Sequence, residues 1–179
     1  MEIYLVRHTS PNIEKGICYG QSDIGITNSF ASEVEKIHQQ IPVTEISRVY
    51  SSPLQRCKLL AKTFNMPFTT DPRLKEMDFG DWELQAWDDI PTTQLNPWMK
   101  SFVTTQVPNG ESYVMLQDRI LNFYNSLHIG PEEKIVVVTH AGPMRALLAH
   151  IRKIELKDSF TIKIGYGDVI VIPTLPKKI

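Results

Sequence analysis

Cysteine is scarce in this sequence, and neither sign of charge prevails. The 179 residues include two cysteines, Cys18 and Cys57, too few for a disulfide framework, so we expect reduced and packed thiols. Nineteen Lys and Arg residues stand against 20 Asp and Glu residues, which gives a formal net charge of -1. The overall charge therefore provides no general attraction for nucleic acid or for an anionic membrane, and we expect neither as a partner.

Long apolar stretches, internal repeats and low-complexity linkers are also missing. No stretch approaches the ~20 apolar residues that span a bilayer, and the opening MEIYLVRH lacks a basic region followed by a signal-type apolar segment. We therefore expect a cytoplasmic protein. With 42% hydrophobic residues, the chain can bury one core but is too short for two ordinary ones, which predicts a single domain over residues 1–179.

Strand-like and helix-like segments alternate along the chain. Apolar runs predict strands at 3–6, 46–50 and 135–138, with a short one near Phe68, and apolar residues at helical spacing predict helices at 30–41, 54–64, 113–127 and 143–151. Ser52 and Pro53 are placed to cap and begin the second helix. Two further strands, 161–164 and 169–172, should form a hairpin-like pair. The pattern predicts an α/β fold, a three-layer α/β/α sandwich with a mostly parallel central sheet.

Residues 77–110 interrupt this alternation. The segment contains several prolines, and we expect an irregular lobe with a short helix. It also contains the three tryptophans of the chain, Trp82, Trp87 and Trp98. One tryptophan alone is more typical of a small satellite core, whereas the group could line a pocket and stack on a flat ring. The sequence does not decide between these two roles.

Three predicted strands lead into residues suited to binding or catalysis. In chain order these segments are Arg7-His8, Ser51-Ser52-Pro53-Leu54-Gln55-Arg56 and Thr139-His140-Ala141-Gly142. Because α/β sheets expose their sites at the carboxyl ends of strands, we expect these residues to share one site. The guanidinium groups of Arg7 and Arg56 would supply planar, fixed donors for a phosphate dianion.

The same set provides a nucleophile and an acid for phosphate ester cleavage. Arg7 and Arg56 disfavour a protonated His8, which keeps its ring available as a nucleophile. Glu76 would protonate the leaving alkoxide and then deprotonate water, since repulsion from a bound phosphate dianion favours the protonated carboxyl. His140 would donate to a phosphoryl oxygen and stabilise the charge that grows in the transition state.

Taken one at a time, these residues also have ordinary interpretations. A histidine at a strand end is often a core or capping residue, and a helical arginine often pairs with a nearby acid. Glu76 lies near Asp78, Asp81 and Glu83, and most such acids are solvated surface groups. The joint occurrence of Arg, His, Arg and His after three strands favours the catalytic interpretation.

Six motifs spread over residues 3 to 145 resemble the histidine phosphatase superfamily, in the order typical of that family. They are LVRHTS, CYGQSD, YSSPLQRC, LKEMDFGDWE, PNGES and VVVTHAGPMR. CYGQSD, EMDFGDWE and PNGES look most like the α-ribazole phosphatase subgroup. The resemblance implies a phosphoglycerate mutase-like fold, a phosphohistidine intermediate and no cofactor. It further implies a phosphomonoesterase acting on α-ribazole 5′-phosphate or adenosylcobalamin 5′-phosphate.

Two positions beside the main motifs are further candidates for phosphate or substrate binding. They are Gln21, in CYGQSD, and Ala141, in THAG. Ala141 replaces a residue that is often glycine or glutamine in the family, and Thr9 departs from the glycine common after the Arg-His pair. Both departures concern local loop geometry and leave the expected chemistry unchanged.

Other phosphate-handling classes fit less well. HAGPMR resembles a cysteine-phosphatase loop, but Ala141 stands where the thiolate is needed. We expect no metal, because arginines accompany His8 and His140 and no carboxylate pair stands at ligand spacing. A phosphoglycerate mutase would share these residues and stays open, although such chains are longer. A non-catalytic phospho-ligand binder would need neither His8 nor Glu76. The expected partner is a small phosphomonoester, and the sequence leaves a homodimer open.

Overall fold

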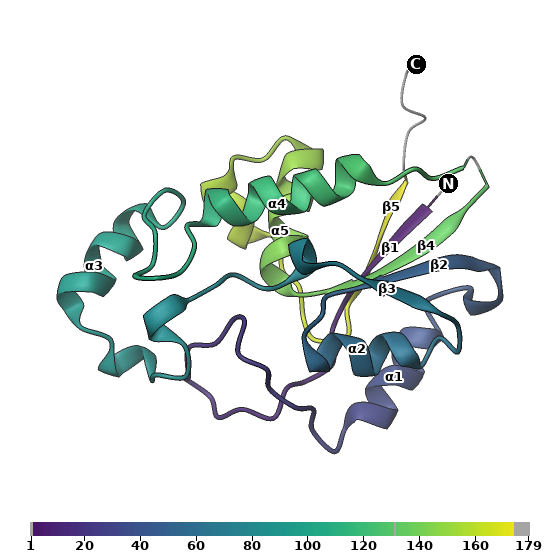
Figure 1. The fold of residues 1–179 in the computed structure, drawn as a ribbon, viewed down its shortest axis with the longest axis horizontal. Coiled ribbons are helices and arrows are strands. Elements are labelled where there is room, and N and C mark those ends of the chain that lie inside the picture. The colour runs from purple at the N-terminus through teal and green to yellow at the C-terminus, as the bar shows by residue number, and fades with distance from the viewer. Residues whose placement is uncertain (1, 131, 174–179) are drawn as a thin grey trace.

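One five-stranded sheet forms the centre of the protein in a computed structural model that describes residues 2–130 and 132–173 (Figure 1). The strands are β1 (Glu2–Arg7), β2 (Ile46–Ser51), β3 (Phe68–Thr70), β4 (Lys134–Thr139) and β5 (Val169–Pro173). Their order across the sheet is β3-β2-β4-β1-β5. The pairs formed among β1 to β4 are all parallel, and β5 runs antiparallel to β1. The predicted mostly parallel sheet is confirmed.

The central strands are buried on both faces, and alternate side chains enter two different cores. Ile3 and Leu5 of β1 belong to one core, whereas Tyr4 and Val6 belong to the other. In β4 every residue after Lys134 is buried. Parallel strands covered on both faces show continuous apolar runs rather than an alternating pattern. This burial explains why the sequence presents β4 as an unbroken run of apolar residues.

Helices cover both faces of the sheet and complete the predicted three layers. They are α1 (Phe30–His38) and α2 (Gln55–Lys62) on one face, and α4 (Tyr113–Ser126) and α5 (Ala141–Arg152) on the other (Figure 1). Ile37 of α1 and Leu60 of α2 share a core with Val6, whereas Leu116 of α4 and Leu147 of α5 share a core with Leu5. Within the described residues, none of the helices is long and apolar enough to cross a membrane.

Residues 77–110 form an excursion whose two ends meet. The excursion contains α3 (Thr92–Ser101) and the 3₁₀ turns η3 (Gly80–Trp82) and η4 (Trp87–Asp89), and α3 lies away from the sheet in Figure 1. At its base, Asp81 N donates to the carbonyl of Pro108 at 3.0 Å. Gly80 has φ +47°, and a Cβ there would lie 2.2 Å from that carbonyl oxygen. Only glycine therefore fits this crossing of the two chain segments.

The predicted hairpin near the C-terminus is wrong in its first strand. Residues 156–161 form the 3₁₀ helix η5 (Leu156–Thr161), and residues 162–164 lie outside the strands of the described chain. Side chains bind the carbonyls there, because Arg145 Nε donates to Ile162 O (3.1 Å) and Arg7 Nη1 donates to Ile164 O (2.8 Å). β5 pairs with β1 instead. Residues 161–164 therefore place their carbonyls against two arginine side chains instead of pairing with β5.

The predicted cap of the second helix is also wrong. α2 begins at Gln55, and its N-cap position is occupied by Leu54 without a side-chain cap bond. Ser52 is fully buried, and its Oγ shares a 2.8 Å hydrogen bond with Nε2 of His140. It also accepts a 3.3 Å hydrogen bond from Leu54 N. Ser52 thus connects β2 to the residue after β4 rather than starting a helix.

Candidate active site

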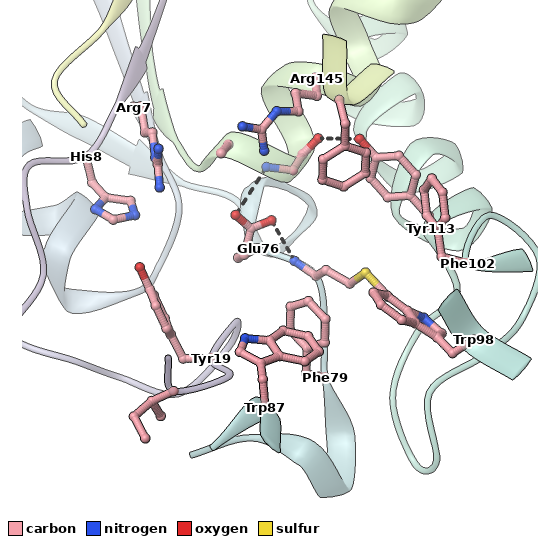
Figure 2. A pocket seen from close by; sticks show the side chains of 15 residues that line it. Arg7, His8, Tyr19, Glu76, Phe79, Trp87, Trp98, Phe102, Tyr113 and Arg145 are labelled. Atoms are coloured by element: carbon pink, nitrogen blue, oxygen red, sulfur yellow. Dashed lines mark hydrogen bonds between the residues drawn. The ribbon is translucent and has the colours of Figure 1, made fainter. Parts of the chain in front are cut away.

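A cavity of about 400 Å³ opens beyond the carboxyl ends of β1 and β4. Its polar side consists of Arg7, His8, Tyr19, Glu76, Gly142 and Arg145, and its other side of Phe79, Trp87, Trp98, Phe102, Tyr113 and Phe160. In Figure 2, Glu76 lies between the pair Arg7 and His8 and the aromatic side chains. The cavity is therefore charged at one end and apolar at the other.

His8 is buried in a defined tautomer. Its Nδ1 lies 2.7 Å from the carbonyl oxygen of Thr9, which can only accept, so Nδ1 donates and Nε2 carries the lone pair. Burial, followed by the charges of Arg56 and Arg7, holds the pKa of His8 well below its ordinary value of 6.5, against the opposing bond to Thr9. The ring is neutral at pH 7, with Nε2 as its nucleophilic atom.

Arg7 presents its guanidinium beside His8. The guanidinium carbon lies 3.8 Å from the ring centroid of Tyr166, and Nη1 donates to the carbonyl of Ile164 at 2.8 Å. Tyr166 in turn shares a 2.7 Å hydrogen bond with Tyr19 across the phenol oxygens. Nε of Arg7 is buried without a partner among the described residues. These contacts hold the cation at the cavity while leaving donor capacity for an anion.

Arg56 is brought to His8 but is not among the residues that line the cavity. It is fully buried, and its Nε donates to His8 Nε2 at 3.3 Å. Nη1 donates to Ser22 O at 2.8 Å and Nη2 to Gly20 O at 2.6 Å. Arg56 therefore ties the loop after β1 to the predicted nucleophile.

The same loop is held from its other side by Glu83, which sequence analysis treated as a solvated acid. The carboxylate accepts five hydrogen bonds of 2.6–3.1 Å, from the backbone nitrogens of Gly20, Gln21, Ser22 and Phe79 and from Ser22 Oγ. Burial raises the pKa of Glu83, but these hydrogen bonds outweigh burial and lower the pKa below its ordinary value of 4.5. Glu83 joins the loop beneath His8 to the start of the excursion.

We expect Glu83→Gln to destabilise the fold, because an amide offers one acceptor oxygen and turns an NH₂ group toward backbone donors. Each backbone N–H left without an acceptor costs about 1–3 kcal/mol. Denaturant unfolding followed by circular dichroism would measure the loss, with the exposed Glu14 of the same loop, changed to Gln, as control. Since the folded pKa lies below the unfolded value, the difference between wild type and variant should be full at pH 7 and shrink as pH falls below about 4.5. A difference that stays constant to pH 3 would contradict this role.

Glu76 is fixed against the first turn of α5. Oε2 accepts from Gly142 N at 3.1 Å, and Oε1 accepts from Met77 N at 2.9 Å (Figure 2). A Cβ on Gly142 would lie 2.1 Å from Oε1 of Glu76, so any other residue there would displace the carboxyl. The sequence placed Glu76 and Gly142 in separate motifs, and the fold brings them into contact.

His140 is fully buried beside His8 and, like Arg56, is not among the residues that line the cavity. The two imidazole centroids are 5.0 Å apart in an edge-to-face arrangement. Besides its bond to Ser52, His140 has Cys57 Sγ at 3.4 Å from Nε2. Burial, then the neighbouring His8 and Arg56, lowers the pKa of His140 well below 6.5. A neutral His140 therefore packs against the neutral His8.

The two lower-ranked sequence candidates differ in position. Ala141 lines the cavity at the start of α5. Gln21 does not reach the wall, because its side-chain Nε2 donates to the carbonyl of Glu76 at 3.2 Å and its backbone N donates to Glu83. Gln21 thus supports the backbone that carries Glu76.

The tryptophans divide between the two roles that the sequence left open. Trp82 is 1% exposed and donates from Nε1 to Gln94 Oε1 at 2.9 Å, so it belongs to the core. Trp87 and Trp98 line the cavity with their ring centroids 6.0 Å apart and their planes 28° apart. They form an apolar wall opposite the charged end.

Arg145, which was not among the residues predicted from the sequence, adds a second guanidinium to the cavity wall. Its Nε donates to the carbonyl of Ile162 at 3.1 Å, and its guanidinium carbon lies 5.1 Å from the ring centroid of Phe160. A signal was available in HAGPMR, because Arg145 follows Ala141 by four residues and helical residues at that spacing share a face. As to metals, the described residues contain no group of three or more His, Cys, Asp or Glu side chains that could hold an ion.

Known proteins resemble this chain over nearly its whole length. The model of the histidine phosphatase superfamily (branch 1) matches residues 3–178. A protein of Proteus mirabilis named "Probable phosphoglycerate mutase GpmB" is 28% identical over 93% of this chain and 85% of its own. A Hydrogenobacter thermophilus protein named "Putative phosphoserine phosphatase 2" is 27% identical over 95% and 88%. The crystal structure of the α-ribazole phosphatase from Shigella flexneri superposes with a TM-score of 0.86 at 21% identity, over 99% and 92% of the two chains, which is a likeness of fold.

Proposed function

This chain belongs to the histidine phosphatase superfamily (branch 1), and from that premise we propose that it is a phosphomonoesterase acting through a phosphohistidine on His8. Members of the superfamily are phosphatases and mutases. One observation carries the proposal: a buried, neutral His8, with its lone pair on Nε2 and Arg56 as a neighbour, lines the same cavity as Arg7 and a carboxyl group, Glu76. Nucleophile, anion-binding donors and acid are thus present in one site.

In the first step, Nε2 of His8 attacks phosphorus and the bond to the leaving oxygen breaks. Arg7 binds the phosphoryl oxygens, and Arg56 exchanges its long 3.3 Å bond to Nε2 for a phosphoryl oxygen as that lone pair is used. Protonated Glu76 gives its proton to the leaving oxygen, so an alcohol departs. His140 donates to a phosphoryl oxygen, exchanging its bond to Ser52 for this one.

In the second step, water attacks the phosphohistidine. The ionised Glu76 takes a proton from the water as its oxygen bonds to phosphorus and the Nε2–P bond breaks. Inorganic phosphate leaves, and His8 returns to its neutral form. Glu76 is again protonated, which closes the cycle without a cofactor.

The substrate that we propose is α-ribazole 5′-phosphate, or adenosylcobalamin 5′-phosphate with the same base. A nucleotide phosphate of this kind has its charge at one end and a flat, apolar dimethylbenzimidazole ring at the other. The cavity has the same polarity, with Arg7 and His8 opposite Trp87 and Trp98. Stacking on aromatic rings favours a planar base in a way that a small triose phosphate cannot exploit. The motifs shared with the α-ribazole phosphatase subgroup support the same choice.

Arg145 favours a second candidate, a phosphomonoester that also carries a carboxylate. Its guanidinium lines the cavity between the charged end and Phe160, where it could bind a carboxylate in a bidentate way. Phosphoserine and phosphoglycerates have this second anion, and two of the curated relatives bear names that refer to such substrates.

A substrate panel separates the two candidates. We expect kcat/KM to be higher for α-ribazole 5′-phosphate than for 3-phosphoglycerate, phosphoserine or fructose bisphosphates, with no net mutase reaction. Trp98→Ala should lower kcat/KM for α-ribazole 5′-phosphate by up to about tenfold, the scale of one aromatic contact. The same change should leave the hydrolysis of ethyl phosphate unchanged. Its neighbour Met99 is 63% exposed, and Met99→Ala serves as the control. A preference for phosphoserine that Arg145→Met removes would replace the first candidate by the second.

A further inference from the structure

The backbone that carries Glu76 is fixed by side chains rather than by a sheet. Residues 73–76 follow β3, outside the strands of the described chain. Arg119 of α4 donates three hydrogen bonds of 2.7–2.8 Å to this segment, to the carbonyls of Arg73, Lys75 and Glu76. Thr139 Oγ1, at the end of β4, donates to the remaining carbonyl, that of Leu74, at 2.7 Å. All four consecutive carbonyls are therefore bound by side-chain donors.

Arg119 is itself held by a carboxylate. Its Nε donates to Glu111 Oε1 at 2.7 Å, and its Nη2 donates to Glu111 Oε2 at 2.9 Å. The two side chains are 17% and 15% exposed, so the pair is well shielded from solvent. A guanidinium has five N–H donors in one plane, and the three carbonyls and two carboxylate oxygens supply one acceptor for each. A lysine has three donors on a single nitrogen and cannot span this set.

We propose that Arg119, oriented by Glu111, is a positioning residue for the acid Glu76. This inference rests on the proposed function. Arg119 is not among the residues that line the cavity and acts through the carbonyl of Glu76, which belongs to the same planar peptide group as the Met77 N–H that binds the carboxyl. Releasing these carbonyls lets the Glu76 backbone move relative to His8. A displacement of about 1 Å at a reacting group costs on the order of 10²-fold in rate.

Positioning and mere structural support differ in their dependence on the leaving group. A poorly placed acid slows loss of a basic alkoxide, whereas p-nitrophenolate departs with little need of a proton. kcat/KM covers the steps up to departure of the leaving group. We therefore expect Arg119→Lys to lower kcat/KM by roughly 10–100-fold for ethyl phosphate and less than about threefold for p-nitrophenyl phosphate.

The matched control is Arg48, which also binds a carboxylate and a carbonyl, those of Glu133 and His128, but far from the cavity. Arg48→Lys should change kcat/KM by no more than about twofold for either ethyl phosphate or p-nitrophenyl phosphate. Equal losses on both substrates for Arg119→Lys, or none, would overturn the inference while leaving the phosphatase in place. If Arg119→Lys fails to fold, Glu111→Gln replaces it and must show the same leaving-group dependence, or the inference fails. A wild-type protein that hydrolyses neither ester would overturn the proposed function and this inference with it.

Discussion

Replacing His8 by alanine is expected to abolish turnover, by on the order of 10⁴-fold or more, the scale on which loss of a catalytic nucleophile acts. Alanine removes Nε2, the only protein atom proposed to form a bond to phosphorus, whereas Arg7 remains to bind the phosphate and Glu76 remains to protonate the leaving group. Because His8 is buried with a depressed pKa, an uncharged replacement introduces no new buried charge. Thermal unfolding should therefore show a folded variant.

Rapid quench with ³²P-labelled substrate measures the intermediate directly. Acid-labile, alkali-stable label should appear on His8 in the wild type and be absent from His8→Ala. The control is His150, which is exposed near the end of α5, and His150→Ala should keep both label and rate. Undiminished turnover by His8→Ala would exclude the phosphohistidine route.

Replacing Glu76 by glutamine is expected to have the second largest effect, and one that depends on the ester. General acid catalysis contributes about 10²–10⁴-fold, so kcat/KM for an alkyl phosphate should fall by that order. The loss for p-nitrophenyl phosphate should be much smaller, because its leaving group scarcely needs a proton. Glutamine is nearly isosteric and keeps one oxygen for either Gly142 N or Met77 N, so the change tests chemistry more than shape.

Steady-state kinetics on a series of esters with leaving groups of increasing basicity would measure this dependence. The slope of log kcat/KM against the leaving-group pKa should become steeper in Glu76→Gln than in wild type. Asp88 of the excursion is exposed, and Asp88→Asn provides a carboxyl-to-amide control that should leave the slope unchanged. Parallel slopes for Glu76→Gln and wild type would argue against Glu76 as the acid.

The sequence allowed the sheet and the neighbourhood of the site to be predicted because both depend on local patterns. An apolar run followed by Arg7-His8 or by Thr139-His140 is visible without any knowledge of contacts, and parallel strands bring such ends together. The failures depend on long-range partners. Residues 161–164 look like a strand, but Arg145 and Arg7 bind the carbonyls of Ile162 and Ile164. Periodicity carries no information about such distant side-chain partners.

The role of Glu83 could not be predicted for a similar reason. Its five donors come mainly from residues 20–22, about 60 positions away, and a single acidic residue among other acids looks solvated. Arg119 presents the same difficulty, because its acceptors are backbone carbonyls, which every residue possesses. Side chains that act on backbone atoms leave no distinctive residue type at the other end of the contact.

The closed base of the excursion separates the catalytic residues from part of the apolar wall. Asp81 N meets Pro108 O, and Glu111 N meets Asp78 O at 2.8 Å, so the two ends of the excursion are joined to each other. His8, Glu76 and Arg119 all lie on the domain side of that junction, whereas Trp98 and Phe102 of the cavity wall lie within residues 88–107. A relative could therefore exchange residues 88–107 for a segment of another length or composition and acquire a new substrate while inheriting the phosphoryl-transfer chemistry intact. In this architecture, substrate range can diversify by recombination of one surface module.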